Sequence, residues 1–172
     1  MGDIHESVRV ACPFVAAATY LSEYLERHGS DRDSAHFNMR LEPAALQALE
    51  LAPGDRGVRV AIRALRTADA PDVRYRIRWL PERVGPHTLF LGALALDRLQ
   101  TDHDAFALRL DGRFELPRDA SPHALPDLFA QRIAAATAAA LLGRIDAFVT
   151  DAADTARTRG QHTNGVAHGY RA

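Results

Sequence analysis

The sequence predicts an α+β domain in which several antiparallel strands are followed by one long C-terminal helix. Residues 58–65 and 73–80 alternate apolar and polar side chains with the period of two that marks half-buried strands. Near the C-terminus, Ser121-Pro122 is a helix-start signal, and the apolar residues from Leu125 to Phe148 follow at helical spacing. Since each apolar face must be covered, we expect this alanine-rich helix to pack across a curved sheet.

The remaining elements follow from the same signals in chain order. Pro13 suits the first turn of a helix, and Gly29 suits the position just past its end. Residues 31–34 and 53–57 predict turns, and residues 43–51 predict a strand or an irregular edge. The expected strands are residues 4–10, 35–42, 58–65, 73–80, 88–98 and 105–116, and the expected helices are residues 14–27 and 121–149. Gly92 lies within a strand and predicts a bend or a close backbone approach.

The strands place large apolar side chains on one face, which we expect to face the helix. On this face Tyr75 and Trp79 combine an apolar body with a hydrogen-bond donor, so they are candidate polar anchors as well as candidate core residues. Apolar pockets with few polar anchors suit small-molecule binding. The candidate ligand-binding residues are Phe37, Met39, Val60, Ile62, Tyr75, Ile77, Trp79, Phe90, Leu94, Phe106, Leu108, Leu110, Phe129 and Ile133.

Charged residues occupy the opposite face of the same strands. Arg109, Asp111, Arg113 and Glu115 alternate in charge, and we expect the carboxylates of this set to pair with the arginine rows Arg59/Arg63 and Arg74/Arg76/Arg78 on neighbouring strands. These rows predict a basic outer face, which is either simply solvated or a contact surface for anionic lipid head groups, a partner or RNA.

Composition excludes several classes of function. The 172 residues carry a net charge of −1, and all 21 basic residues are arginine, so no global field favours nucleic acid. The N-terminus lacks a signal-peptide pattern, and the most apolar stretch, 133–142, is short for a bilayer span, so a cytoplasmic location and no transmembrane segment are expected. Residues 1–152 predict a single domain, and the polar, non-periodic residues 153–172 predict a disordered tail.

No motif indicates a catalytic residue, a metal or a cofactor. Of the eight histidines, none forms a His-x-x-x-His pair or lies in a ligand cluster. Asp102-His103-Asp104 is a turn-like sequence, and the single cysteine, Cys12, reads as a small buried side chain. We expect no catalytic residue, no metal and no cofactor.

Three stretches resemble the START-like superfamily of polyketide cyclases/dehydrases and lipid-transport proteins, which has the helix-grip fold. They are Ile4 to Gly29, Ile77-Arg78-Trp79-Leu80-Pro81 with Leu89 to Leu94, and the final strand with Gln131 to Leu142. The resemblance covers residues 4–150 and is strongest to small bacterial members. It implies about seven antiparallel strands curved around the C-terminal helix, with a cavity between them for lipids, sterols, quinones or polyketides. Residues 31–34 leave little room for the family's second short helix.

The leading hypothesis is therefore a non-enzymatic binder or carrier of a hydrophobic small molecule. A cyclase or dehydratase using Tyr75 or a nearby histidine for proton transfer is an alternative. A protein-interaction module that uses the basic outer face is a third. The oligomeric state is left open by the sequence.

Overall fold

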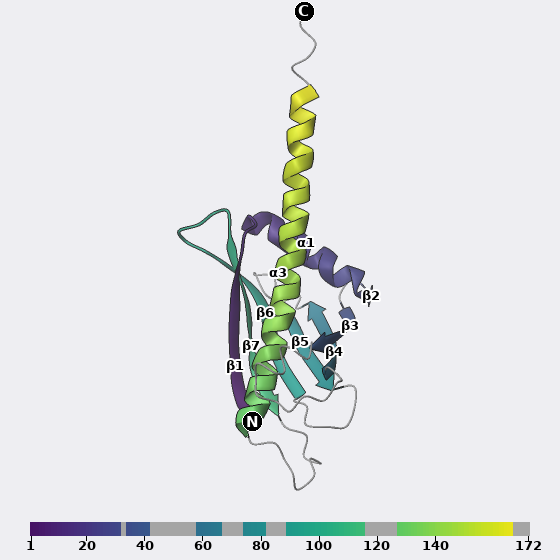
Figure 1. The fold of residues 1–172 in the computed structure, drawn as a ribbon, viewed down its shortest axis with the longest axis vertical. Helices are drawn as coiled ribbons and strands as arrows, with labels where there is room; N and C mark the ends of the chain where they lie inside the picture. The colour runs from purple at the N-terminus through teal and green to yellow at the C-terminus, as the bar shows by residue number, and fades with distance from the viewer. Residues whose placement is uncertain (32–33, 42–57, 67–73, 82–88, 116–126, 167–172) are drawn as a thin grey trace, which may run out of the picture.

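The computed structural model describes residues 1–31, 34–41, 58–66, 74–81, 89–115 and 127–166. The described residues form one antiparallel sheet with strand order β1-β7-β6-β5-β4-β3-β2, accompanied by two helices (Figure 1). The strands are β1 (Gly2–Val10), β2 (Gly29–Asp31), β3 (Ser34–Leu41), β4 (Val58–Arg66), β5 (Arg74–Pro81), β6 (Leu89–Arg98) and β7 (Phe106–Glu115). The helices are α1 (Phe14–Arg27) and α3 (Asp127–Val166). The predicted α+β class, with an antiparallel sheet and a long C-terminal helix, is confirmed.

The alternating pattern of the strands is confirmed where their side chains are described. On β5, Tyr75, Ile77 and Trp79 are buried, whereas the three arginines between and before them are exposed. The predicted turn at 31–34 is only partly correct, because Asp31 ends the short strand β2 and Ser34 begins β3. The predictions for residues 43–51, the turn at 53–57 and the helix start at Ser121 lie outside the described residues.

Helix α3 is longer than the sequence predicted. It continues to Val166, so the predicted end near Val149 and the predicted disorder of residues 153–166 are wrong. Beyond Ala153, residues 154–159 are exposed, and this part of the helix projects past the sheet in Figure 1. A helix segment that buries no face needs no apolar residues at helical spacing, so the sequence of this part looks like that of a disordered tail.

The apolar content of α3 also corrects the expectation about bilayer-length segments. Residues Gln131–Arg159 are long and apolar enough, by length and composition, to cross a membrane. Here Leu141, Ile145 and Val149 are buried in the same hydrophobic cluster as the sheet residues. The apolarity of α3 is therefore that of a core helix, which needs apolar side chains for the same physical reason.

A pair of glycines lets two strands approach closely in the middle of the sheet. Gly92 of β6 lies directly across from Gly112 of β7. A Cβ atom on Gly112 would lie 2.5 Å from both Gly92 Cα and the Phe90 ring, and one on Gly92 would lie 2.6 Å from Phe90 Cε1. The Phe90 ring thus covers the space that two side chains would otherwise occupy. The predicted close approach at Gly92 is confirmed.

The helices cover one face of the sheet. Close backbone contacts of α3 are concentrated on β1 and β7 at one edge and include β3 near the other, with few to β4, β5 or β6. Helix α1 contacts α3, β2, β3 and β6. The long helix therefore bridges the sheet, and the central strands lie farther from it than the strands beside them.

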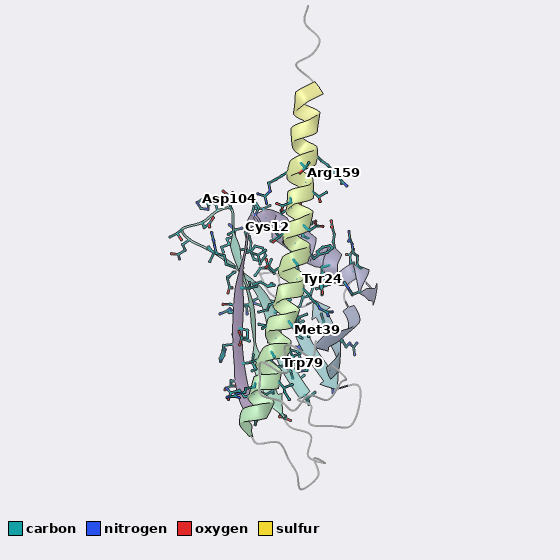
Figure 2. All side chains as sticks on the ribbon, viewed as in Figure 1. Cys12, Tyr24, Met39, Trp79, Asp104 and Arg159 are labelled. Atoms are coloured by element: carbon teal, nitrogen blue, oxygen red, sulfur yellow. The ribbon has the colours of Figure 1, made fainter. Side chains whose placement is uncertain are left out.

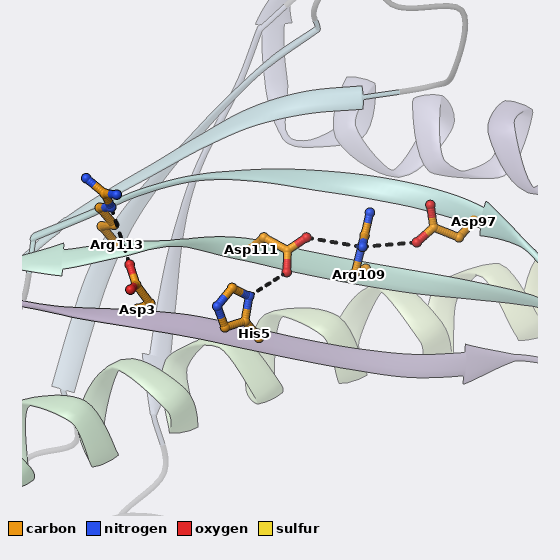
Figure 3. Close-up of polar contacts among 6 residues, drawn as sticks. All are labelled: Asp3, His5, Asp97, Arg109, Asp111 and Arg113. Atoms are coloured by element: carbon orange, nitrogen blue, oxygen red, sulfur yellow. Dashed lines mark hydrogen bonds and ion pairs between the residues drawn. The ribbon is translucent and has the colours of Figure 1, made fainter.

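The other face carries a network of ion pairs across β1, β7 and β6 (Figure 3). Arg109 Nε lies 3.0 Å from carboxylate oxygens of both Asp97 and Asp111, and Asp111 also lies 2.9 Å from His5 Nδ1. Arg113 Nε lies 3.3 Å from Asp3. The predicted pairing of β7 with the arginine rows of β4 and β5 is wrong, because β7 lies between β1 and β6.

Candidate functional site

The sequence-predicted ligand-binding residues divide into those whose side chains are described and those whose side chains are not. All ten in the first group are buried: Met39, Tyr75, Ile77, Trp79, Phe90, Leu94, Phe106, Leu108, Leu110 and Ile133. The side chains of Phe37, Val60, Ile62 and Phe129 lie outside the described part. Nine of them lie on the strand face that meets α3 and Ile133 lies on α3 itself, so the predicted sidedness of the strands agrees with the structure.

Strand register places three of the predicted aromatic residues, Phe37, Trp79 and Phe90, in one row across the sheet. Phe37, Ile62, Trp79, Phe90 and Phe114 occupy successive paired positions from β3 to β7. Within this row the rings of Trp79 and Phe90 stack, with centroids 3.8 Å apart and planes 9° from parallel. The Phe90 ring also covers the glycine pair, so the two stacked rings form one aromatic pair in the middle of the sheet.

A second row carries the polar group best placed for binding. Tyr75, Leu94, Leu110 and Glu6 are paired in turn across β5, β6, β7 and β1. The Tyr75 hydroxyl lies 3.1 Å from Ser22 Oγ of α1, and either oxygen can be the donor. Two hydroxyls that share one hydrogen bond retain one further O–H donor between them. The pair can therefore donate to a carbonyl or hydroxyl oxygen of a bound molecule.

The Trp79 indole is the other buried donor on this face. Trp79 is only 1% exposed, and no hydrogen-bond partner for its N–H is found in the described part of the chain. Buried tryptophan N–H groups normally find a partner, and an unpaired buried donor costs about 1–3 kcal/mol. A ligand acceptor is one group that would satisfy it.

The buried surface of α3 mixes large and small side chains in its first described turns and is mainly large afterwards. Ile133, Ala134, Thr137 and Ala138 are buried first, and Leu141, Leu142 and Ile145 follow. Thr137 Oγ1 donates to the Ile133 carbonyl oxygen at 2.8 Å, so its hydroxyl is satisfied within the helix. In the view of Figure 2, Trp79 and Met39 lie at the height of the lower half of α3, and Tyr24 lies above them.

The contact between α1 and α3 closes one end of this face. The Tyr24 ring lies between His28 and Phe148, with centroids 4.6 and 5.3 Å away. Burial raises the pKa of Tyr24, and nearby Arg144 lowers it by a smaller amount. Tyr24 is therefore a neutral packing residue, and Ser22, two positions earlier, is the α1 residue that contacts Tyr75.

Two polar residues of this face were not among the predicted site residues. Ser22 lies on the predicted helix, but no sequence signal indicates that it meets Tyr75, 53 positions away. Glu6 could be identified from the sequence, because it alternates with the polar residues of β1 and so lies on the same face as Val8 and Val10; it is half-buried there. Alternation along a strand shows which face a residue lies on, whereas contacts between distant elements are known only from the fold.

The described residues contain no group of three or more metal-ligating side chains. His5 lies in the outer ion-pair network, His28 stacks on Tyr24, and His103 is exposed in the β6–β7 turn. In that turn Asp102 accepts from Arg9 and from the Asp104 amide, and these contacts lower the pKa of the Asp102 carboxyl. Asp102-His103-Asp104 is thus a structural turn, as the sequence suggested.

Comparisons with known proteins identify the fold. A Streptomyces aromatase/cyclase superposes with a TM-score of 0.53 at 13% identity, covering 88% of this chain and 93% of its own. A conserved protein from Geobacillus kaustophilus gives 0.55 at 12% identity, covering 90% and 96%. A protein from Thermus thermophilus gives 0.52 at 13% identity, covering 88% and 99%. No family model matches the sequence, and no curated protein matches it.

Proposed function

Given that this chain has the START-like, helix-grip fold, we propose that it binds or carries a hydrophobic small molecule between the central strands and α3. The fourteen residues predicted from the sequence are the proposed lining, with Ser22 added. The proposed ligand is an elongated apolar molecule of the lipid, quinone or polyketide class. A single START-like domain over residues 1–152 is part of the same proposal.

The arrangement of α3 over the sheet is the observation that carries this proposal. The helix contacts mainly one edge of the sheet, reaches β3 near the other, and makes few close backbone contacts with β4, β5 and β6. The strands that it bridges bear Tyr75, Ile77, Trp79, Phe90 and Leu94, all buried. The stacked Trp79–Phe90 pair offers a planar aromatic surface, which favours a planar or extended apolar guest over a compact one.

The two donors define which apolar molecules are favoured. Tyr75 and Trp79 are four residues apart on one face of β5, a separation of about 13 Å along an extended strand. A ligand with oxygen acceptors near both ends would satisfy the Tyr75–Ser22 pair and the Trp79 N–H together. A pure hydrocarbon would satisfy neither.

Native mass spectrometry of protein purified without detergent tests this proposal. We expect a co-purified or added quinone, fatty acid or aromatic polyketide to appear as a one-to-one complex. Tyr75→Phe and Trp79→Phe should weaken the complex by about ten-fold each, since a buried hydrogen bond contributes ~1–1.5 kcal/mol. Tyr20→Phe, on the half-buried side of α1, is the matched control. Absence of any complex across the three ligand classes would contradict the proposal.

An enzyme of the cyclase or dehydratase type is the second candidate. It is favoured by the Tyr75 hydroxyl, a buried group hydrogen-bonded to Ser22 that can move a proton on a bound chain. His5, His28 and His103, the histidines with described side chains, do not belong to the inner row. Tyr75→Phe should then abolish turnover of a linear poly-β-ketone, a loss far beyond the roughly ten-fold weakening of binding expected from the lost hydrogen bond. Full turnover in that variant would exclude the role.

A further inference from the structure

On the outer face of the sheet, the arginines of β7 form ion pairs, whereas three exposed arginines of β4 and β5 form none among the residues that the structure describes. On β1, β7 and β6, the cations Arg109 and Arg113 each contact aspartates (Figure 3). On β4 and β5, Arg63, Arg76 and Arg78 are exposed, and no ion pair is found for them within the described ranges. Among the described side chains, the sheet therefore has an ion-paired half and a half in which three exposed arginines lie together without an acidic contact.

Strand register brings like charges together in the second half. Arg63 of β4 lies directly across from Arg78 of β5. Side chains at opposed positions have Cβ atoms about 4.5–5.5 Å apart, and like charges there are destabilising. Arg76 lies two residues along the strand, about 7 Å away on the same face. This concentration of charge is unfavourable for folding alone, so an anionic partner would relieve it.

An apolar side chain adjoins these arginines. Leu91 of β6 lies directly across from Arg78 and is 51% exposed, which makes it the one exposed large apolar residue among the described strand side chains. Exposed Ala93 lies across from Arg76. We define the basic face as Arg63, Arg76, Arg78, Leu91 and Ala93. Its make-up, an apolar anchor beside guanidinium groups, is that of a protein-binding surface.

We propose that the basic face docks an acidic segment of a partner protein that carries both carboxylates and apolar side chains. Arginine pairs with carboxylates through two parallel hydrogen bonds, and Leu91 supplies the apolar contact. The surface lies on the opposite side of the sheet from α3, so docking leaves the proposed ligand site free.

Other polyanions fit the basic face less well. No aromatic side chain belongs to it, so it offers nothing on which nucleic-acid bases would stack. Leu91 is its one large apolar group, and one leucine contributes only about 1.5–3 kcal/mol on burial, which is little for membrane insertion. An acidic protein segment requires neither feature.

Fluorescence anisotropy of a labelled peptide tests the proposal. The probe is a 16-residue peptide of glutamate and leucine, compared with duplex DNA and phosphatidylserine vesicles in the same buffer. We expect saturable binding of the peptide at 50 mM NaCl, weakened at least ten-fold at 300 mM. Arg63→Gln with Arg78→Gln should weaken it at least ten-fold, and Leu91→Ser should weaken it several-fold with an unchanged salt dependence.

The matched control is Arg109→Gln with Arg113→Gln, which removes the same charge from the ion-paired half of the face. It should change peptide affinity less than two-fold. Equal loss in the two double variants, absence of peptide binding, or tighter binding to DNA or vesicles would each overturn the proposal. Far-ultraviolet circular dichroism confirms that the variants are folded.

Discussion

The glycines of this chain show how identical residues can have opposite roles. Gly92 lies in the sheet under Phe90, whereas Gly143 on α3 has nothing within 4 Å of the position of a Cβ. We expect Gly92→Ala to destabilise the fold by about 1–3 kcal/mol, because the added methyl meets backbone and ring. Gly143→Ala should stabilise it by up to ~1 kcal/mol through helix propensity. Urea unfolding measures both, and equal effects would contradict the close approach.

The Tyr75–Ser22 hydrogen bond joins α1 to the middle of the sheet. A double-mutant cycle with Tyr75→Phe and Ser22→Ala isolates its contribution, because each change removes the same contact. We expect a coupling free energy of about 0.5–1.5 kcal/mol in unliganded protein. Strictly additive losses would show that the two hydroxyls act independently.

Cys12 is buried at the junction of β1 and α1. Burial raises the pKa of its thiol, and Arg157 lowers it by a smaller amount. The thiol is therefore protonated and shielded, and its favourable burial is lost only as the pH rises through the raised pKa. We expect its reaction with a disulfide reagent at pH 8 to require unfolding. Rapid labelling of folded protein would contradict this burial.

Among residues, the sequence predicts side-chain direction well and partners poorly. The parity of β5 correctly separates Tyr75 and Trp79 from the arginines, because alternation is a local property of a strand. It cannot indicate that Tyr75 meets Ser22, or that Arg113 meets Asp3. Those contacts depend on how distant segments pair.

At the scale of elements, α3 is where sequence and structure differ most. Its apolar stripe predicts the part that covers the sheet, and this part ends near Val149 and Ala153, which are buried. The continuation to Val166 has no apolar face, so hydrophobic periodicity cannot detect it. The three-residue strand β2 is likewise too short to show a period.

Truncation of α3 separates its covered and projecting parts. Ending the chain after Ala153 should leave the stability almost unchanged, because residues 154–159, the described side chains that this change removes, are exposed. Ending it after Phe148 should cost about 2–4 kcal/mol, since Val149 and Ala153 leave the hydrophobic cluster. Thermal unfolding compares the two, and equal stability would contradict the assigned end of the core.

At the scale of the whole molecule, the sheet order is the feature that organises both surfaces. The pairing of β1 with β7 places the acidic residues of β1, β7 and β6 together and isolates the arginines of β4 and β5. It also places α3 mainly beside β1 and β7, leaving the central strands to line the proposed site. Neither arrangement follows from local patterns, although the class of fold does.

Tryptophan fluorescence can report on the proposed interior site, because the single tryptophan, Trp79, is buried and is one of the proposed lining residues. Titration with a ubiquinone analogue, followed by tryptophan emission, tests the central claim most directly. An interior ligand should quench Trp79 saturably at one equivalent in wild-type protein and in the Arg63→Gln/Arg78→Gln variant alike, and more weakly in Tyr75→Phe. Emission that stays unchanged, or falls linearly without saturation, would contradict an interior ligand site.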